Sequence, residues 1–137
     1  PIVVLPVPGV PVNTIRIEFY FFKTIKGIVR EIQMSEVVLL YCPCSSEEEA
    51  QKIADALLSK KLVAWVNFLP MRSSFWWNGK IENANEVLLL AKTLKEKILD
   101  VEKEVKLVHS YGVPCISFYE ARHVSREYEE YVVDSIS

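Results

Sequence analysis

One short stretch does most to set the topology of this 137-residue chain: Phe75-Trp76-Trp77-Asn78-Gly79-Lys80-Ile81. Asn-Gly is the strongest short signal for a two-residue β-hairpin, because both central residues of a type I′ turn need a positive φ. The aromatic and β-branched residues on either side favour strands. The sequence therefore predicts an antiparallel hairpin that turns at Asn78 and Gly79.

Four further apolar runs are rich in branched residues and predict the remaining strand positions. Residues 62–69 and 86–92 lie on either side of the hairpin, and we expect Pro70 to interrupt the first of them. Residues 36–41 form the first strand, which we expect to end at Pro43. Residues 115–120 form the last.

Three stretches with apolar residues at helical spacing lie between or after these strands. The first follows a capping box of Ser45 and Glu48, and the second follows a capping box of Thr93 and Glu96. Ser125 is the expected N-cap of the third. The apolar faces are Ala50, Ile53, Ala54, Leu57 and Leu58; then Leu94, Ile98, Val101, Val105 and Val108; then Tyr128, Tyr131, Val132 and Ile136.

The order strand, helix, strand, hairpin arm, strand, helix, strand, helix is typical of the α+β class. It predicts a ferredoxin-like split βαβ sandwich, in which an antiparallel sheet carries its helices on one face. Residues 37–40 and 87–91 do not alternate with polar residues, so the other face is also apolar. A sheet that is apolar on both sides predicts that partner subunits cover the second face.

Composition excludes several classes of protein. Half of the residues are hydrophobic, the formal net charge is −2 and the pI is about 5.8. Because phosphate binding needs a surplus of Lys and Arg, nucleic acid is not an expected partner. Three cysteines cannot all pair within one chain, and this odd number favours a reducing, cytoplasmic location over a secreted disulfide scaffold.

Residues 1–33 differ from the rest of the chain. They are apolar and aromatic and hold four of the seven prolines within the first eleven positions. Prolines and charged residues interrupt every apolar stretch, so we expect no membrane span. We predict a strand over 15–22, a helix over 24–32, and an N-terminal extension at 1–33 attached to a domain at 34–137. Its removal is expected to leave the assembly of the domain intact.

The domain resembles the CutA divalent-cation-tolerance family over residues 36–136. The resemblance rests on the run 62–67 (LVAWVN), the run 74–81 (SFWWNGKI), Glu86, the pair Lys92-Thr93 and the run 109–114 (HSYGVP). It implies a ferredoxin-like fold, a tight homotrimer with its contacts on the second sheet face, and a response to divalent ions such as copper. Trp65, Ser110 and Cys115 depart from the usual residues of the family.

The candidate metal ligands are Cys42, His109 and Cys115. Cys42 falls where some members of that family carry a cysteine proposed to bind copper. Thiols with an imidazole favour Cu(I) or zinc over magnesium or calcium. We expect Cys42 and Cys44 to point to opposite faces unless Pro43 turns the chain, which would make them a poor chelate.

Each candidate ligand also has a purely structural interpretation. Cysteines are among the most buried residue types, so the thiols can be small core residues. His109 is predicted to end a helix, where the helix dipole and a carbonyl contact stabilise an imidazole. His123 lies in a polar loop and is expected to be solvated.

A second candidate site is a cleft between subunits lined by Trp77, Glu86, Lys92 and Tyr111, with His109 nearby. Trp76 and Trp77 alternate on a strand, and we interpret them first as interface anchors. The chain has neither a Gly-rich phosphate loop nor a Gly-x-Ser-x-Gly or His-Glu-x-x-His motif, so no enzymatic activity is expected.

Two functions remain open from the sequence. The first is a homotrimeric divalent-metal tolerance or response protein without an obligatory cofactor, which binds copper or another divalent ion directly. The alternative is a trimeric signalling or scaffolding protein that binds a small anion or a partner protein between subunits. That alternative rests on likeness of fold to nitrogen-regulatory signalling trimers alone.

Overall fold

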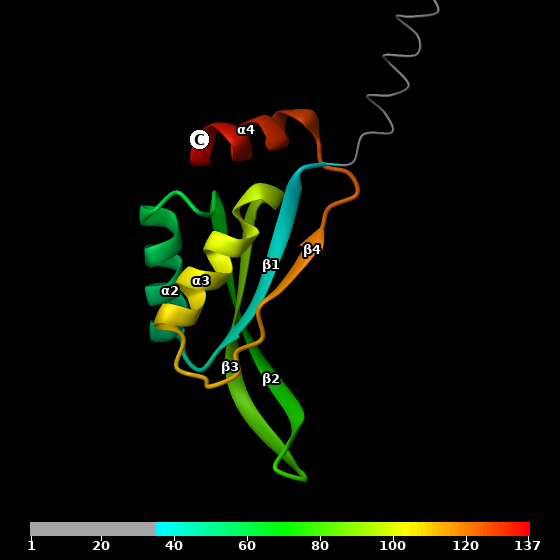
Figure 1. Cartoon of the computed structure of the whole chain (residues 1–137). Helices are drawn as coiled ribbons and strands as arrows, with labels where there is room; N and C mark the ends of the chain where they lie inside the picture. Colours follow the sequence, from blue (N-terminus) through cyan, green and yellow to red (C-terminus); the bar gives the residue numbers. More distant parts are fainter. Residues whose placement is uncertain (1–34) are drawn as a thin grey trace, which may run out of the picture. The chain divides into compact units, whose positions relative to one another are not determined.

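A computed structural model of the chain describes residues 35–137 (Figure 1). The strand and helix predicted at 15–22 and 24–32, and the proposed extension, lie outside the described residues. Within residues 35–137 the elements follow the predicted order, except that the predicted hairpin is not a separate arm but continues the strands before and after it. The elements are β1 (Val37–Cys44), α2 (Glu47–Ser59), β2 (Trp65–Trp77), β3 (Lys80–Leu94), the short 3-10 turn η1 (Lys95–Lys97), α3 (Ile98–Val108), β4 (Ser117–Glu120) and α4 (Arg126–Ile136).

The four strands form one antiparallel sheet in the order β2-β3-β1-β4. Helices α2 and α3 lie side by side on one face of this sheet, and α4 lies across one end (Figure 1). This is the ferredoxin-like split βαβ arrangement, and the predicted fold class is confirmed.

The main core lies between the sheet and α2 and α3. Alternate residues of β1 point into it, because side chains in a strand alternate between faces. Its fully buried members are Leu40, Cys42, Cys44, Ala50, Ile53, Ala54, Leu57, Leu89, Ala91, Val101 and Val105. A smaller cluster of Val37, Leu94, Val132 and Ile136 joins α4 to the end of the sheet.

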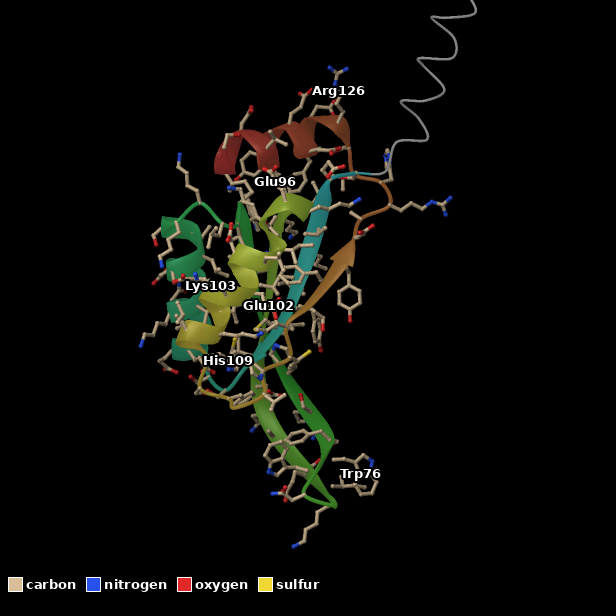
Figure 2. The ribbon with its side chains drawn as sticks, viewed as in Figure 1. Trp76, Glu96, Glu102, Lys103, His109 and Arg126 are labelled. Carbon is tan, nitrogen blue, oxygen red and sulfur yellow. The ribbon has the colours of Figure 1, made fainter. Side chains whose placement is uncertain are left out.

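The hairpin of β2 and β3 extends well beyond β1. The Asn-Gly turn is confirmed, with φ of 48° at Asn78 and 74° at Gly79. β1 pairs with β3 only as far as Cys44 opposite Val87, whereas β2 and β3 continue to Trp77 opposite Lys80. The outer half of the hairpin is therefore a two-stranded arm whose end carries the exposed Trp76 (Figure 2).

The two predicted proline breaks are wrong. β1 continues through Pro43, which lies opposite Leu88 of β3. β4 pairs only with residues 38–41 of β1. At Pro43 the edge of β1 that faces β4 is therefore unpaired, and a proline there removes no hydrogen bond of the sheet. Pro70 lies within β2, which is an edge strand of the sheet among the described residues, and edge strands tolerate proline.

The predicted helix starts also need correction. The N-cap of α2 is Ser46, whose Oγ accepts a hydrogen bond from the Glu49 backbone N–H at 3.1 Å. Thr93 caps no helix: it lies in β3 and its hydroxyl donates to the Leu62 carbonyl at 2.6 Å. Ser125 occupies the N-cap position of α4 but makes no side-chain capping bond.

Candidate metal centre

Two thiols and one imidazole meet where β1 ends and α3 ends. The ligand atoms of Cys42, Cys44 and His109 all lie within 4.8 Å of one another, and all three side chains are buried. β1 supplies the two cysteines from its last residues, and His109 is the C-cap of α3 (Figure 2). The expected helix-end position of His109 is confirmed, since its N–H bonds to the Val105 carbonyl.

The expectation that the two thiols point to opposite faces is wrong. Cys42 and Cys44 are two residues apart in a regular strand, and residues with that spacing share a face. Both are 0% exposed and lie in the core under the helices, while Pro43 between them faces the other way. The strand geometry therefore brings both sulfurs to the same side of β1 without any turn at Pro43.

Both ring nitrogens of His109 have partners. Nε2 lies 2.8 Å from the Pro43 carbonyl oxygen, and Nδ1 accepts the Tyr111 backbone N–H at 3.1 Å. A nitrogen that accepts carries no proton, so these contacts assign the neutral tautomer with hydrogen on Nε2. The imidazole holds the end of β1 against the loop that follows α3.

Glu49 of α2 lies next to the imidazole, with its Oε1 3.7 Å from His109 Nδ1. Its carboxylate also accepts from the Ser110 backbone N–H and from both the N–H and the hydroxyl of Ser45, the latter two at 2.7 and 2.6 Å. Burial alone would raise the pKa of Glu49, but the hydrogen bonds from Ser110 and Ser45 outweigh it and lower the pKa to about 2. Glu49 is therefore ionised beside the cluster.

The two thiols interact with each other and with the backbone. Hydrogen bonding to Cys44 and burial both raise the pKa of the Cys42 thiol, so Cys42 is protonated in the metal-free protein. Cys44 Sγ donates to the Cys42 carbonyl at 3.5 Å. A metal ion at this site must therefore displace protons from sulfur.

The other predicted sulfur ligand lies outside the cluster. Cys115 is exposed, and its Sγ lies 3.3 Å from the Ser117 hydroxyl. It sits in the irregular segment before β4, because that strand begins at Ser117 and not at the predicted residue 115. His123 is exposed in the loop before α4, as expected.

The four predicted cleft residues do not gather within one chain. Tyr111 and Glu86 do meet, since the Tyr111 hydroxyl donates to Glu86 Oε2 at 2.9 Å. Burial and this bond raise the pKa of Tyr111 to about 12. Lys92 instead donates to Asn67 at 2.6 Å, and it is six residues, or about 20 Å, from Glu86 along β3. Trp77 is 56% exposed at the far end of the arm.

Comparison with known proteins assigns this chain to a family. Residues 38–135 match the profile of the family described as CutA1 divalent ion tolerance protein. The chain belongs to the CutA1 divalent ion tolerance family. The matched residues include every candidate metal and cleft residue: Cys42, Cys44, Trp77, Glu86, Lys92, His109, Tyr111 and Cys115.

This chain is also similar to individual CutA proteins. The divalent-cation tolerance protein CutA of Archaeoglobus fulgidus is 42% identical over 97 residues, which are 71% of this chain and 95% of that protein. The CutA of Thermotoga maritima is 32% identical over 100 residues, 73% of this chain and 99% of that one. The solved structure of the A. fulgidus protein, described as periplasmic, aligns with a TM-score of 0.73 at 40% identity over 74% of this chain and 99% of the other.

Two residues of the candidate site were not predicted from the sequence. Cys44 was expected to point away from Cys42, although the two-residue spacing on a strand already places both on one face. Glu49 was not singled out from the sequence, and no sequence signal links it to His109, 60 positions away. In the described part of the chain, no helix is long and apolar enough to cross a membrane.

Proposed function

We propose that this CutA1 family member acts as a cytoplasmic homotrimer that binds a metal ion directly, with Cys42 and His109 as ligands. The observation that carries the proposal is the buried thiol and imidazole cluster at the end of β1. Soft sulfur with imidazole nitrogen suits copper and zinc, and it does not suit magnesium or calcium. The three free cysteines support a reducing compartment.

The trimer is supported by the sheet face opposite α2 and α3. The strand register places on that face Leu39, Tyr41, Leu69, Leu88, Leu90 and Tyr119, of which Leu69 is 45% and Tyr119 58% exposed. An apolar surface of this extent is typical of a subunit interface. Cleft residues that are separate in one chain, such as Trp77 and Lys92, can then be brought together by neighbouring subunits.

The assembly is tested by light scattering on two matched variants. Leu90→Glu places a charge at the centre of the open face, opposite Tyr41 and Asn67, and is expected to dissociate the trimer. Leu107→Glu is the control, because Leu107 is 72% exposed on α3. A wild-type monomer would contradict the proposal. A chain lacking residues 1–33 is expected to remain trimeric.

Metal binding is tested by titrating the reduced protein with copper and with zinc. We expect about one tightly bound ion per chain, lost in Cys42→Ala and in His109→Ala. Cys115→Ala and His123→Ala are the controls, since both residues are exposed and outside the cluster. A trimer that binds no metal below millimolar concentration would contradict the metal site and favour a small anion or a partner protein as the ligand.

A further inference from the structure

The second thiol, Cys44, changes what kind of ion the cluster suits. We propose that Cys42, Cys44 and His109 form a dithiol–imidazole site that selects the monovalent ion Cu(I) over Zn²⁺ and Cu²⁺. This inference rests on the proposed function and deepens it, because it names a further ligand and the ion. It starts from the placement of both sulfurs on one face of β1, within 4.8 Å of each other and of an imidazole nitrogen.

The donor set excludes hard cations. Calcium and magnesium take oxygen ligands, and the cluster of described residues supplies two sulfurs and a nitrogen. The nearest carboxylate, that of Glu49, is already used by Ser45 and Ser110, which supply three hydrogen bonds to it. Thiolate ligands select Cu(I) or zinc among the common ions.

The number of available ligands then separates Cu(I) from zinc. Zinc in a structural site is almost always four-coordinate and tetrahedral. Here three ligands are present, and Cys42, Cys44 and the imidazole of His109 are all 0% exposed, so no open position is left for water. Cu²⁺ prefers a tetragonal set of nitrogen and oxygen donors, which the cluster lacks. A soft ion of low coordination number, Cu(I), fits the three donors.

Binding of Cu(I) releases the protons of the two thiols. Binding replaces the two S–H bonds by two Cu–S bonds and releases two protons to solvent, so the cluster changes from neutral to a net charge of −1. The imidazole stays neutral: ligation through Nδ1, which already carries a lone pair, displaces the Tyr111 N–H and leaves Nε2–H on the Pro43 carbonyl. The remaining Nε2–H contact with a backbone carbonyl is of the kind that orients metal-bound histidines.

The experiment is an anaerobic competition between the full-length, reduced protein and a coloured Cu(I) chelator, repeated with Zn²⁺ and a zinc indicator. We expect one Cu(I) per chain and weaker binding of Zn²⁺. Cys44→Ala is expected to weaken Cu(I) binding by about 100-fold or more, since loss of an outer-shell partner alone costs 10- to 100-fold. Cys115→Ala, which removes the exposed thiol, is expected to match the wild type.

The outcomes distinguish this inference from the proposed function. If Cys42→Ala abolishes binding while Cys44→Ala binds Cu(I) like Cys115→Ala, the second thiol is not a ligand and only this inference fails. Tighter binding of Zn²⁺ than of Cu(I) would overturn the ion selectivity. If neither cysteine variant differs from the wild type, the proposed metal site itself fails.

A second measurement covers the case in which Cys44→Ala does not fold. X-ray absorption at the copper edge of the loaded wild-type protein counts the sulfur neighbours of the ion. Two sulfurs per copper are expected from Cys42 and Cys44, with one nitrogen from His109. A single sulfur would overturn the proposal without any variant.

Discussion

Nε2 of His109 lies 2.8 Å from the carbonyl oxygen of Pro43, the residue between the two buried cysteines. This contact joins the C-terminal end of α3 to the last residues of β1, 66 positions earlier in the chain. The imidazole of His109 therefore stabilises the fold of the metal-free protein, and it is also a ligand in the proposed metal-bound protein. Stability and metal binding are expected to depend on it together.

Replacement of His109 by Ala is expected to destabilise the metal-free protein by about 2–4 kcal/mol. The change leaves the Pro43 carbonyl without a donor and leaves a cavity where a fully buried ring was. Urea unfolding at fixed protein concentration measures the loss. His123→Ala, in an exposed loop, is expected to stay within about 0.5 kcal/mol of the wild type. Equal stability of the two variants would contradict the structural role of His109.

Acid is expected to lower the stability of the folded protein by protonating Glu49. Its pKa falls from 4.5 to about 2 on folding, so the native state binds fewer protons than the unfolded state between these values. A depressed carboxyl pKa contributes stability that is fully present above about pH 4.5 and lost as pH falls toward 2. The melting temperature measured from pH 6 down to pH 2 should therefore fall more steeply in the wild type than in Glu49→Gln.

The control for this pH series is Glu48→Gln, because Glu48 is exposed on the same helix turn and makes no side-chain hydrogen bond among the described residues. Its melting profile should follow that of the wild type. If Glu49→Gln and Glu48→Gln give the same acid profile, the hydrogen bonds from Ser45 and Ser110 do not set the stability in acid.

Sequence periodicity was enough to predict the order of elements, because each element buries one face. The Asn78-Gly79 turn and the apolar face of α2 are local signals. The turn appears as predicted, and so does the face except for Leu58, which is 41% exposed. The errors lie where neighbouring strands decide the outcome. Pro43 stays within a strand because β4 ends its pairing with β1 before that residue, and Pro70 does so because β2 is an edge strand of the described sheet. Neither the length of the β4 pairing nor the strand order can be read from the residues around these prolines.

The candidate site was predicted in part for the same reason. Cys42 and His109 were expected as ligands, and the fold brings them together across 67 positions. Cys115 has the right chemistry, but the chain before β4 leaves its side chain exposed. Strand geometry places Cys44 on the same face as Cys42, and the packing of α2 places Glu49 near the end of α3. Only a three-dimensional structure shows that both residues lie beside the imidazole of His109.

The three thiols are expected to react with a thiol reagent in two phases. Cys115 is exposed and should react quickly, whereas Cys42 and Cys44 are fully buried and should react only when the structure opens locally. The raised pKa of Cys42 slows its reaction further, because the thiolate is the nucleophile. Cys115→Ser should remove the fast phase and leave the slow one unchanged. A fast phase that involves all three thiols would show that the cluster is not closed in solution.

The loop after α3 is expected to control access to the cluster. Ser110 bonds to Glu49, and the Tyr111 hydroxyl bonds to Glu86 of β3 at 2.9 Å, so these residues hold the loop over the end of β1. Tyr111→Phe removes one such bond, worth about 0.5–1.5 kcal/mol. If opening of this loop exposes the thiols, the slow phase should accelerate about two- to tenfold. Tyr131→Phe on α4, whose hydroxyl has no hydrogen-bond partner in the described part of the chain, is the matched control. An unchanged slow phase in Tyr111→Phe would show that the thiols are exposed by another opening, such as displacement of the N-terminus of α2.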